Sequence, residues 1–301
     1  MALARTDESA AALAEIGAKP ARGDVLDLPS LLATLRDCEV AYHMAGANAF
    51  CLPDPTPLFR VNVEGSLNVV EAAARAGVRR LVYTSSAATL GERRGRIGRE
   101  DTPHRGWFLS NYERSKFEAE RAVLGAAART GLDVVCVNPA SVQGPGRTSG
   151  TATLLLDYLN AKLRVIVDSR LSLVDIADCT AGHLLAGEWG EAGERYVLCG
   201  STLTVRDAVA LLARETGRDE RPWCLPGPVA SAAAGVVETI ARVRARRPPV
   251  CRELIRTLRH GHVYDGSRAA RELGLVYTPV EETIRRTVRW YEQEGLVRRP
   301  E

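Results

Sequence analysis

Three short apolar runs, separated by segments with helical periodicity, constrain the fold of this chain more than any other feature. The runs cover residues 40–45, 81–85 and 134–138, and each is apolar almost throughout, as expected of strands covered on both faces. Helical patterns cover residues 7–16, 29–36, 58–76 and 111–130, and the last two stop at Gly77 and Gly131. This alternation predicts an α/β fold with a doubly wound parallel sheet.

The second half of the chain has a looser pattern of short strands and helices. It includes an expected strand at 195–199, an expected helix N-cap at Thr204 with Asp207 three residues on, and a final amphipathic helix at 280–293. We therefore expect residues 1–150 to form the sheet domain. Residues 151–301 should form a smaller, mainly helical substrate-side region, with some chain crossing back to the sheet.

Charge and residue counts narrow the class of partner. The chain has 40 Lys and Arg against 37 Asp and Glu, so its balance calls for neither a nucleic acid nor an anionic membrane. A small-molecule substrate is expected. The five histidines do not cluster at metal-ligand spacing, His43 is expected to be a bonded core residue, and no metal is predicted.

The cysteines show no metal-ligand spacing and are interpreted as reduced core thiols. They are Cys38, Cys51, Cys136, Cys179, Cys199, Cys224 and Cys251. No apolar signal follows Met1, so a cytoplasmic protein is expected.

A small-residue apolar stretch at 229–241 is too short to span a bilayer and contains Glu238. The basic run that follows, at 242–247, could contact a phosphate or a lipid headgroup. A charged helix face in water is the favoured interpretation, and no function is assigned to the run.

Tyr112 and Lys116 lie four residues apart at the start of an expected helix, so both side chains share one face. Lowering a tyrosine pKa from about 10 to about 7 needs roughly 4 kcal/mol, and one ammonium at about 4 Å supplies about that much. The pair alone is a weak signal, because many helices carry such a pair by chance as an exposed structural pair.

Hydroxyl and turn residues gather at the expected carboxyl ends of two strands. Ser85 and Ser86 end one strand, and a Pro- and Gly-rich turn at 138–146 follows the next. Ligands of open α/β sheets bind at this edge, which makes it the candidate site.

Four ordered motifs, TSSAATLG, NYERSK, NPASVQGPG and LVDIADCTAGHLLA, resemble those of the extended short-chain dehydrogenases. The likeness is to the dihydroflavonol-reductase-like branch, and within it to bacterial proteins labelled hopanoid-associated sugar epimerases. The resemblance implies that Tyr112 is the general acid/base, that Lys116 lowers its pKa and holds the nicotinamide ribose, and that Ser86 bonds the substrate oxygen. Ser85 would pack or orient its neighbour.

The resemblance also implies a nicotinamide cofactor and its contacts, although a structural turn is the alternative for each. Besides Tyr112 and Lys116, the implied cofactor-binding residues are Asp24, Val25, Ala45, Gly46, Pro139 and Val142. Arg5 would follow the second strand of the family fold, where an arginine accommodates a 2′-phosphate, so NADP is slightly preferred over NAD. Asn62 would support a proton path or make a helix hydrogen bond.

The chain departs from the family at its beginning. Residues 1–5 read like the tail of the family's second strand, and no glycine-rich turn precedes them. Gly91, Gly95 and Gly98 lack the required spacing and are better read as a substrate-side loop. We expect the sheet to be N-terminally incomplete, the working protein to start further upstream, and the chain as given to be poorly stable or weak in cofactor binding.

The leading functional hypothesis is an NAD(P)-dependent enzyme that interconverts a ketone and a secondary alcohol, or epimerises a nucleotide sugar. A non-catalytic cofactor sensor or scaffold, or a truncated inactive form, is the alternative. Arginines in the loop at 92–109 would bind a substrate anion or be solvated, and they are Arg93, Arg94, Arg96, Arg99 and Arg105. The resemblance implies a homodimer through helices 58–76 and 111–130.

Overall fold

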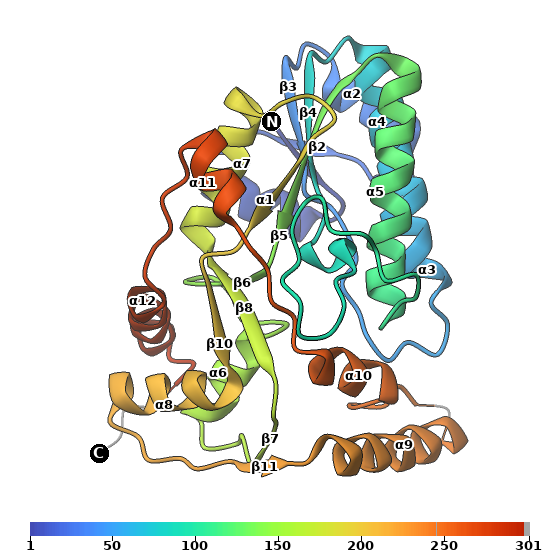
Figure 1. Ribbon diagram of the computed structural model, residues 1–301. Coiled ribbons are helices and arrows are strands. Elements are labelled where there is room, and N and C mark those ends of the chain that lie inside the picture. Colours follow the sequence, from blue (N-terminus) through green and yellow to red (C-terminus); the bar gives the residue numbers. More distant parts are fainter. Residues whose placement is uncertain (245, 298–301) are drawn as a thin grey trace.

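The computed structural model describes residues 1–244 and 246–297. Its centre is a four-stranded parallel sheet in the order β3-β4-β5-β9 (Figure 1). The strands are β3 (Val40–His43), β4 (Arg80–Thr84), β5 (Asp133–Pro139) and β9 (Arg195–Leu198). The four strands expected from the sequence are confirmed, with small differences at their ends.

Helices cover both faces of this sheet, because alternate side chains of each strand point to opposite faces. Leu81 and Tyr83 pack against α2 (Leu28–Leu35), α4 (Gly65–Ala76) and α5 (Asn111–Thr130). Val82 packs on the other face, against α7 (Ile176–Trp189) and α11 (Ser267–Leu273). Figure 1 shows the two layers on either side of the strands. The predicted doubly wound α/β fold is confirmed.

The first strands form a sheet of their own. β1 (Ala2–Ala4) pairs in parallel with β2 (Pro20–Arg22), and α1 (Asp7–Glu15) connects them. Thr6 and Ser9 form a capping box that starts α1. Among the described residues, no strand hydrogen-bonds this pair to β3.

The helix expected over residues 58–76 is interrupted. It consists of α3 (Thr56–Phe59), the π-helical segment Arg60–Glu64 and α4, which ends at Gly77 in the left-handed conformation. The prediction of one continuous helix is therefore wrong in its first part. A π turn adds one residue per turn, and such turns are frequent at functional sites.

The remaining elements build the lower part of the molecule in Figure 1. One small sheet has the order β10-β8-β6, and a second pairs β7 with β11. The strands of these two sheets are β6 (Ser141–Gln143), β7 (Val165–Val167), β8 (Arg170–Asp175), β10 (Ser201–Thr204) and β11 (Trp223–Leu225). The helices of this lower part are α6 (Ala152–Leu159), α8 (Val205–Thr216), α9 (Gly227–Val243), α10 (Arg252–His260) and α12 (Val280–Gln293).

Two sequence predictions for this part are confirmed. Thr204 caps α8 by accepting a hydrogen bond from the Asp207 amide at 3.0 Å, and the final amphipathic helix covers the expected residues. α6, α8 and α12 share one apolar core. Within the described part of the chain, no helix is both long and apolar enough to cross a membrane.

Candidate functional site

Tyr112 and Lys116 lie in the first turns of α5, at the carboxyl end of β4. The Ser110 hydroxyl accepts a hydrogen bond from the Glu113 amide at 3.0 Å and starts the helix, and Gly131 ends it with a φ of 75°. Lys116 is buried, whereas Tyr112 is partly exposed. The helix thus carries a partly exposed phenol with a buried ammonium one turn behind it.

The Lys116 ammonium is held under the end of β4. Its Nζ donates to the Thr84 carbonyl oxygen at 2.8 Å and lies 5.1 Å from the centre of the Tyr83 ring. Burial lowers the pKa of Lys116 to about 8, against the opposing charge of Glu120. Glu120, one turn further along α5, is bonded by Asn138 and Arg195.

Ser86 faces the Tyr112 hydroxyl. Burial raises the pKa of Tyr112, and the hydrogen bond with Ser86 opposes that rise. Lys116 does not shift the pKa of Tyr112 in this structure, because its Nζ donates to the Thr84 carbonyl. The neighbouring Ser85 Oγ is buried and has no hydrogen-bond partner among the described residues.

Asn62 connects three segments around Lys116. Its amide Nδ2 donates to the Ala47 carbonyl and to Ser115 Oγ, and its Oδ1 accepts from the Ala47 amide at 2.7 Å. Ser115 in turn donates to the Tyr112 carbonyl at 2.8 Å. The π segment therefore fixes the turn after β3 against α5, which favours the hydrogen-bonding role for Asn62.

Two buried histidines complete the support. His43 Nε2 lies 2.9 Å from Ser66 Oγ, which itself donates to the Asn62 carbonyl, so the imidazole donates from Nε2. Burial lowers the pKa of His43 to about 3, and the expected core role of His43 is confirmed. His183 bonds the Thr84 hydroxyl at 2.9 Å and so holds the end of β4.

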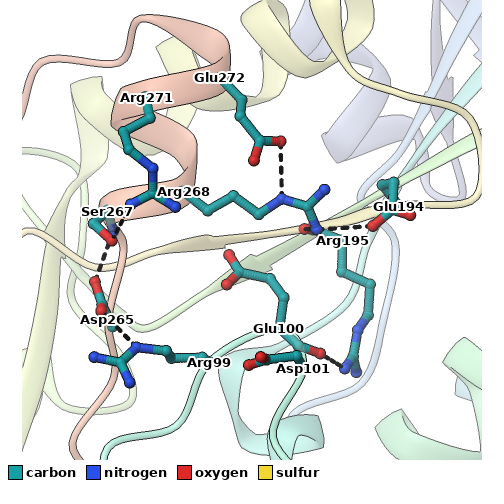
Figure 2. Close-up of a pocket in the computed structure, with 10 residues that line it drawn as sticks. All are labelled: Arg99, Glu100, Asp101, Glu194, Arg195, Asp265, Ser267, Arg268, Arg271 and Glu272. Atoms are coloured by element: carbon teal, nitrogen blue, oxygen red, sulfur yellow. Dashed lines mark hydrogen bonds and ion pairs between the residues drawn. The ribbon is translucent and has the colours of Figure 1, made fainter.

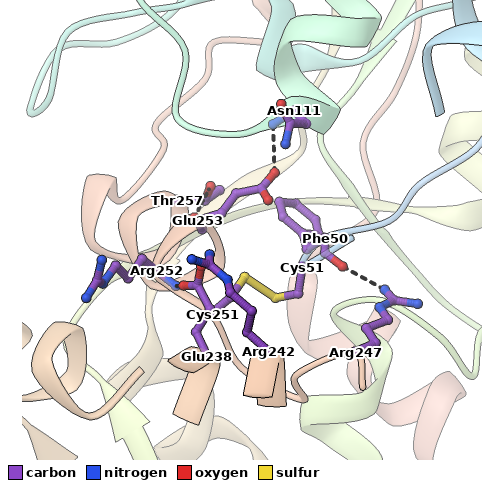
Figure 3. The surroundings of a disulfide bond; sticks show 10 residues. All are labelled: Phe50, Cys51, Asn111, Glu238, Arg242, Arg247, Cys251, Arg252, Glu253 and Thr257. Carbon is purple, nitrogen blue, oxygen red and sulfur yellow. Dashed lines mark hydrogen bonds and ion pairs between the residues drawn. A yellow bond between two sulfur atoms is a disulfide. The ribbon is translucent and has the colours of Figure 1, made fainter. Parts of the chain in front are cut away.

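A disulfide covers the Tyr112 end of the site. Cys51 and Cys251 are joined, although 200 residues separate them, with their Cα atoms 5.6 Å apart (Figure 3). Phe50, next to Cys51, has its ring centre 5.7 Å from that of Tyr112. The prediction that all seven cysteines are reduced core thiols is wrong for this pair, because sequence spacing does not reveal which distant residues the fold brings together.

The chain after this disulfide also reaches α5. Glu253 of α10 accepts from the Asn111 amide at 2.6 Å, and Arg256 donates to the Leu109 carbonyl at 2.6 Å. Figure 3 shows Glu253 pointing from α10 toward Asn111. No sequence signal indicated α10 as a neighbour of Tyr112.

The residues around Lys116 fit the nicotinamide and ribose part of a dinucleotide. An added Cβ at Gly46 would lie 3.4 Å from Asn62 Oδ1 and 3.7 Å from Lys116 Nζ, so the glycine leaves room beside the ammonium. That ammonium has three donors, and the Ser85 hydroxyl lacks a partner. Donors of this kind suit ribose hydroxyls and a carboxamide.

The other expected cofactor contacts lie further along the strand ends. Ala45 follows β3 and is exposed, Pro139 ends β5 and is buried, and Val142 is a half-buried residue of β6.

On the β1–β2 side, Arg5 is exposed after β1, where Arg5 and Thr6 lead into α1. Asp24 Oδ1 accepts from the Leu26 amide at 2.9 Å, and the Val25 carbonyl accepts from Asn68. The structure brings Gly46, Ser86, Tyr112 and Lys116 together, whereas Arg5, Asp24 and Val25 follow the strands β1 and β2, which form a sheet of their own.

The loop at 92–109 encloses a buried polar cluster made of Glu92, His260 and His262. Glu92 Oε1 lies 2.6 Å from His262 Nδ1 and 3.3 Å from His260 Nε2, and the donor atoms of the three residues all lie within 4.8 Å of one another. Despite burial, which raises it, the pKa of Glu92 is lowered to about 2 by the two imidazoles. The prediction that the histidines do not cluster was wrong for these two.

Two arginines of the loop at 92–109 form ion pairs within the protein. Arg105 forms a fully buried ion pair with Glu113 and donates to the Glu92 carbonyl, so it is neither solvated nor available to a substrate. Arg99 pairs with Asp265 at 2.8 Å. The proposed anion-binding role is wrong for Arg105.

A polar cavity of about 540 Å³ lies at the free edge of β9, away from Tyr112 (Figure 2). Three of its arginines are already ion-paired, as Arg268 is with Glu194 and Glu272, and Arg271 donates to the Ser267 hydroxyl. Arg195, at the start of β9, pairs with Glu120 behind it. We interpret the cavity as a compensated ion-pair network rather than an anion site.

Comparison with known proteins identifies the family. The model of the family described as "NAD dependent epimerase/dehydratase family" matches residues 2–199. "Sterol demethylase protein B" of Methylococcus capsulatus is 32% identical, over 98% of this chain and 92% of its own length. "Putative dihydroflavonol 4-reductase" of Synechocystis is 30% identical, over 92% and 82%.

The fold comparison agrees. The crystal structure of gox2253 superposes with a TM-score of 0.86 at 29% identity, over 98% of this chain and 91% of that one. The likeness to the sterol demethylase protein and the superposition on gox2253 each extend over 98% of this chain. The chain therefore belongs to the NAD dependent epimerase/dehydratase family of NAD(P)-dependent enzymes.

Proposed function

We propose that this enzyme interconverts a ketone and a secondary alcohol, with Tyr112 as the general acid/base. The observation that supports this most strongly is the Ser86–Tyr112 hydroxyl pair, with the buried Lys116 ammonium one turn behind it. Two hydroxyls can bond one substrate oxygen from two sides. The family provides the cofactor class, NAD or NADP.

In the reducing direction, the raised pKa of Tyr112 keeps the phenol protonated at neutral pH, so it can donate its proton to the carbonyl oxygen. Ser86 holds the same oxygen. A bound reduced nicotinamide supplies the hydride to the carbonyl carbon. Lys116, with a pKa of about 8, is mostly charged at neutral pH and stabilises the phenolate that remains if its Nζ swings from Thr84 toward Tyr112.

Reduction or oxidation is favoured over epimerisation by the relatives named above. One of them is named a reductase, at 30% identity. The sugar epimerase and dehydratase structures are under 25% identical and share the fold alone. The non-catalytic alternative does not explain why Ser86, Tyr112 and Lys116 converge.

The positions of residues and elements support three further parts of the proposal, which concern the cofactor, the two regions of the chain and the dimer. Arg5 is exposed directly after β1, which supports a slight preference for NADP. Residues 1–150 would hold the cofactor, and residues 151–301 most of the substrate contacts. α4 and α5 lie side by side on one face (Figure 1), and a homodimer would form through them.

The test compares Tyr112→Phe, Ser86→Ala and Ser85→Ala in NADPH oxidation with a panel of aryl and alicyclic ketones. Tyr112→Phe should lower kcat by about 10² to 10⁴ because the proton donor is lost, and it should leave cofactor affinity within a few-fold. Ser86→Ala should lower kcat strongly, whereas Ser85→Ala should leave kcat at saturating NADPH nearly unchanged and weaken NADPH binding instead.

Equal effects of the two serine variants would contradict the assignment of Ser86. Unchanged turnover in Tyr112→Phe would exclude the proposed acid/base role. NADPH binding by titration fluorescence separates loss of chemistry from loss of cofactor.

A further inference from the structure

Helix α9 (Gly227–Val243) carries an apolar stripe that faces away from the protein. Its inner face, with Ala230 and Ala234, packs in one apolar cluster with Ile255 of α10. Its outer face is exposed along the whole helix and consists of Val229, Ala232, Ala233, Val236, Val237, Ile240 and Val243. These positions follow the three- and four-residue spacing of one helix face.

The exposure of this stripe is large. Val236 is 60% exposed, Val243 is 83% exposed, and Ile240 is 47% exposed. Isolated apolar residues on a surface are ordinary, but a contiguous apolar stripe marks a surface that binds something. Thr239, which is exposed beside the stripe, carries no charge.

Positive charge gathers at the end of the same helix. Arg242 has a side chain 80% exposed, and Arg244, Arg246 and Arg247 that follow are exposed as well. Glu238 is the one acidic residue of α9, and it is already bonded to Arg242 and to the Arg252 amide. An arginine at a helix C-terminus stabilises the helix, but that role does not account for the apolar face beside it.

An exposed tryptophan lies on the same border of the molecule. Trp223 of β11 is 81% exposed, and Figure 1 shows β11 and α9 along the lower edge of the protein. Tryptophan favours the boundary between lipid and water, where its ring is apolar and its N–H is solvated.

We propose that α9, with its basic end and Trp223, lies flat on an anionic lipid surface. An amphipathic helix with an apolar face and arginines beside it binds the headgroup boundary without crossing the bilayer. α9 has 17 residues, and within the described chain no helix is long and apolar enough to cross.

Charge argues for lipid and against a second copy of this chain as the occupant. In a parallel pair of α9 helices, the arginines would face arginines. In an antiparallel pair they would face the other helix's start at Gly227, Pro228 and Val229, which offers no carboxylate. Anionic headgroups provide the negative charge that the arginines need, and neither helix pairing provides it.

The lipid-binding surface is coupled to the candidate active site through one helix. α10 packs on the inner face of α9, and its Glu253 and Arg256 bond the backbone at Asn111 and Leu109, beside Tyr112. Docking of α9 would therefore keep the site close to the lipid surface.

The experiment is flotation of the full chain with vesicles. Phosphatidylcholine vesicles with about 30% phosphatidylglycerol should carry the protein, and pure phosphatidylcholine vesicles should carry much less, because arginines near the surface are attracted by anionic lipid. Raising the salt to about 0.5 M should weaken the binding.

Variants identify the surface. Val236→Ser with Ile240→Ser should lower the bound fraction about tenfold, since two apolar side chains of the stripe are lost, and Arg242→Gln with Arg244→Gln should lower it on anionic vesicles only. Val276→Ser, at an exposed valine outside α9, is the control and should bind normally. All these side chains are exposed, so circular dichroism and thermal unfolding should be unchanged.

Absence of flotation with anionic vesicles would overturn the proposal. Flotation that the α9 variants do not alter would overturn it too. A dimer in solution that Val236→Ser with Ile240→Ser converts to monomer would assign the stripe to a second copy instead.

Discussion

Glu92 is a carboxylate buried between two imidazoles, and its low pKa ties its charge to folding. The structure holds its pKa at about 2, whereas its ordinary value is 4.5. A lowered pKa means that the folded state binds the proton less tightly than the unfolded chain. The stabilisation is therefore fully present above about pH 4.5 and is lost as the pH falls through about 2.

We predict that Glu92→Gln destabilises the protein by roughly 3 kcal/mol at pH 5 to 6, because the histidines lose their buried counter-charge. The difference from wild type should shrink as the pH falls from 4.5 toward 2. Urea unfolding at a series of pH values measures it. Glu118→Gln, in a surface pair with Arg114, is the control and should change little. A pH-independent difference would contradict the assigned pKa.

Gly46 permits a second prediction for a single residue. An added methyl group would make ordinary contacts with Asn62 and Lys116, so Gly46→Ala should fold with nearly unchanged thermal stability. The same methyl group fills space beside the Lys116 ammonium and should weaken NADPH binding by about tenfold or more. Calorimetric titration measures the affinity. Normal NADPH affinity would place the nicotinamide ribose elsewhere.

At the scale of elements, the sequence predicted those helices and strands whose apolar pattern is local. The strands around Leu81 and Val134 were recognisable because burial on both faces makes them apolar throughout, and α5 ends at Gly131 as expected. The π segment at Arg60–Glu64 was not recognisable, since one extra residue in a turn hardly changes helical periodicity.

Side-chain partners were predicted less well than elements. The spacing of Tyr112 and Lys116 placed them on one helix face, but it did not predict that Lys116 bonds the Thr84 carbonyl. The apolar stretch around Val236 was visible in the sequence, whereas its exposure was not, because which helix face packs inward depends on α10. Glu92 is far from His260 and His262 in the sequence and meets them only through the fold.

For the whole molecule, part of the chain beyond residue 150 returns to the main sheet. β9, at Arg195–Leu198, adds the outer strand beside β5, and α7 and α11 cover one of its faces. Glu100 accepts a hydrogen bond from the Val197 amide at 2.8 Å and so satisfies part of the free edge of β9. The order of strands depends on such long-range pairing, which local patterns do not encode.

The Cys51–Cys251 bond acts at the scale of the whole chain. In the chain-entropy model, closing a loop of 200 residues stabilises the fold by roughly 5 kcal/mol. We predict that Cys51→Ser lowers the melting temperature of unreduced protein and that reductant then has no further effect. Cys38→Ser, at a free cysteine, is the control. Alkylation of unreduced, denatured protein should modify only the free cysteines, and modification of all seven would contradict the bond.

The same bond has a consequence for proteolysis. Because Cys51 and Cys251 are joined, the intervening chain is a covalent ring with two short tails. A single cut anywhere between these two cysteines opens the ring but releases no fragment, so the nicked enzyme keeps its mass apart from one added water. Such a molecule would pass as intact on a gel until a thiol is added, when it would separate into two pieces.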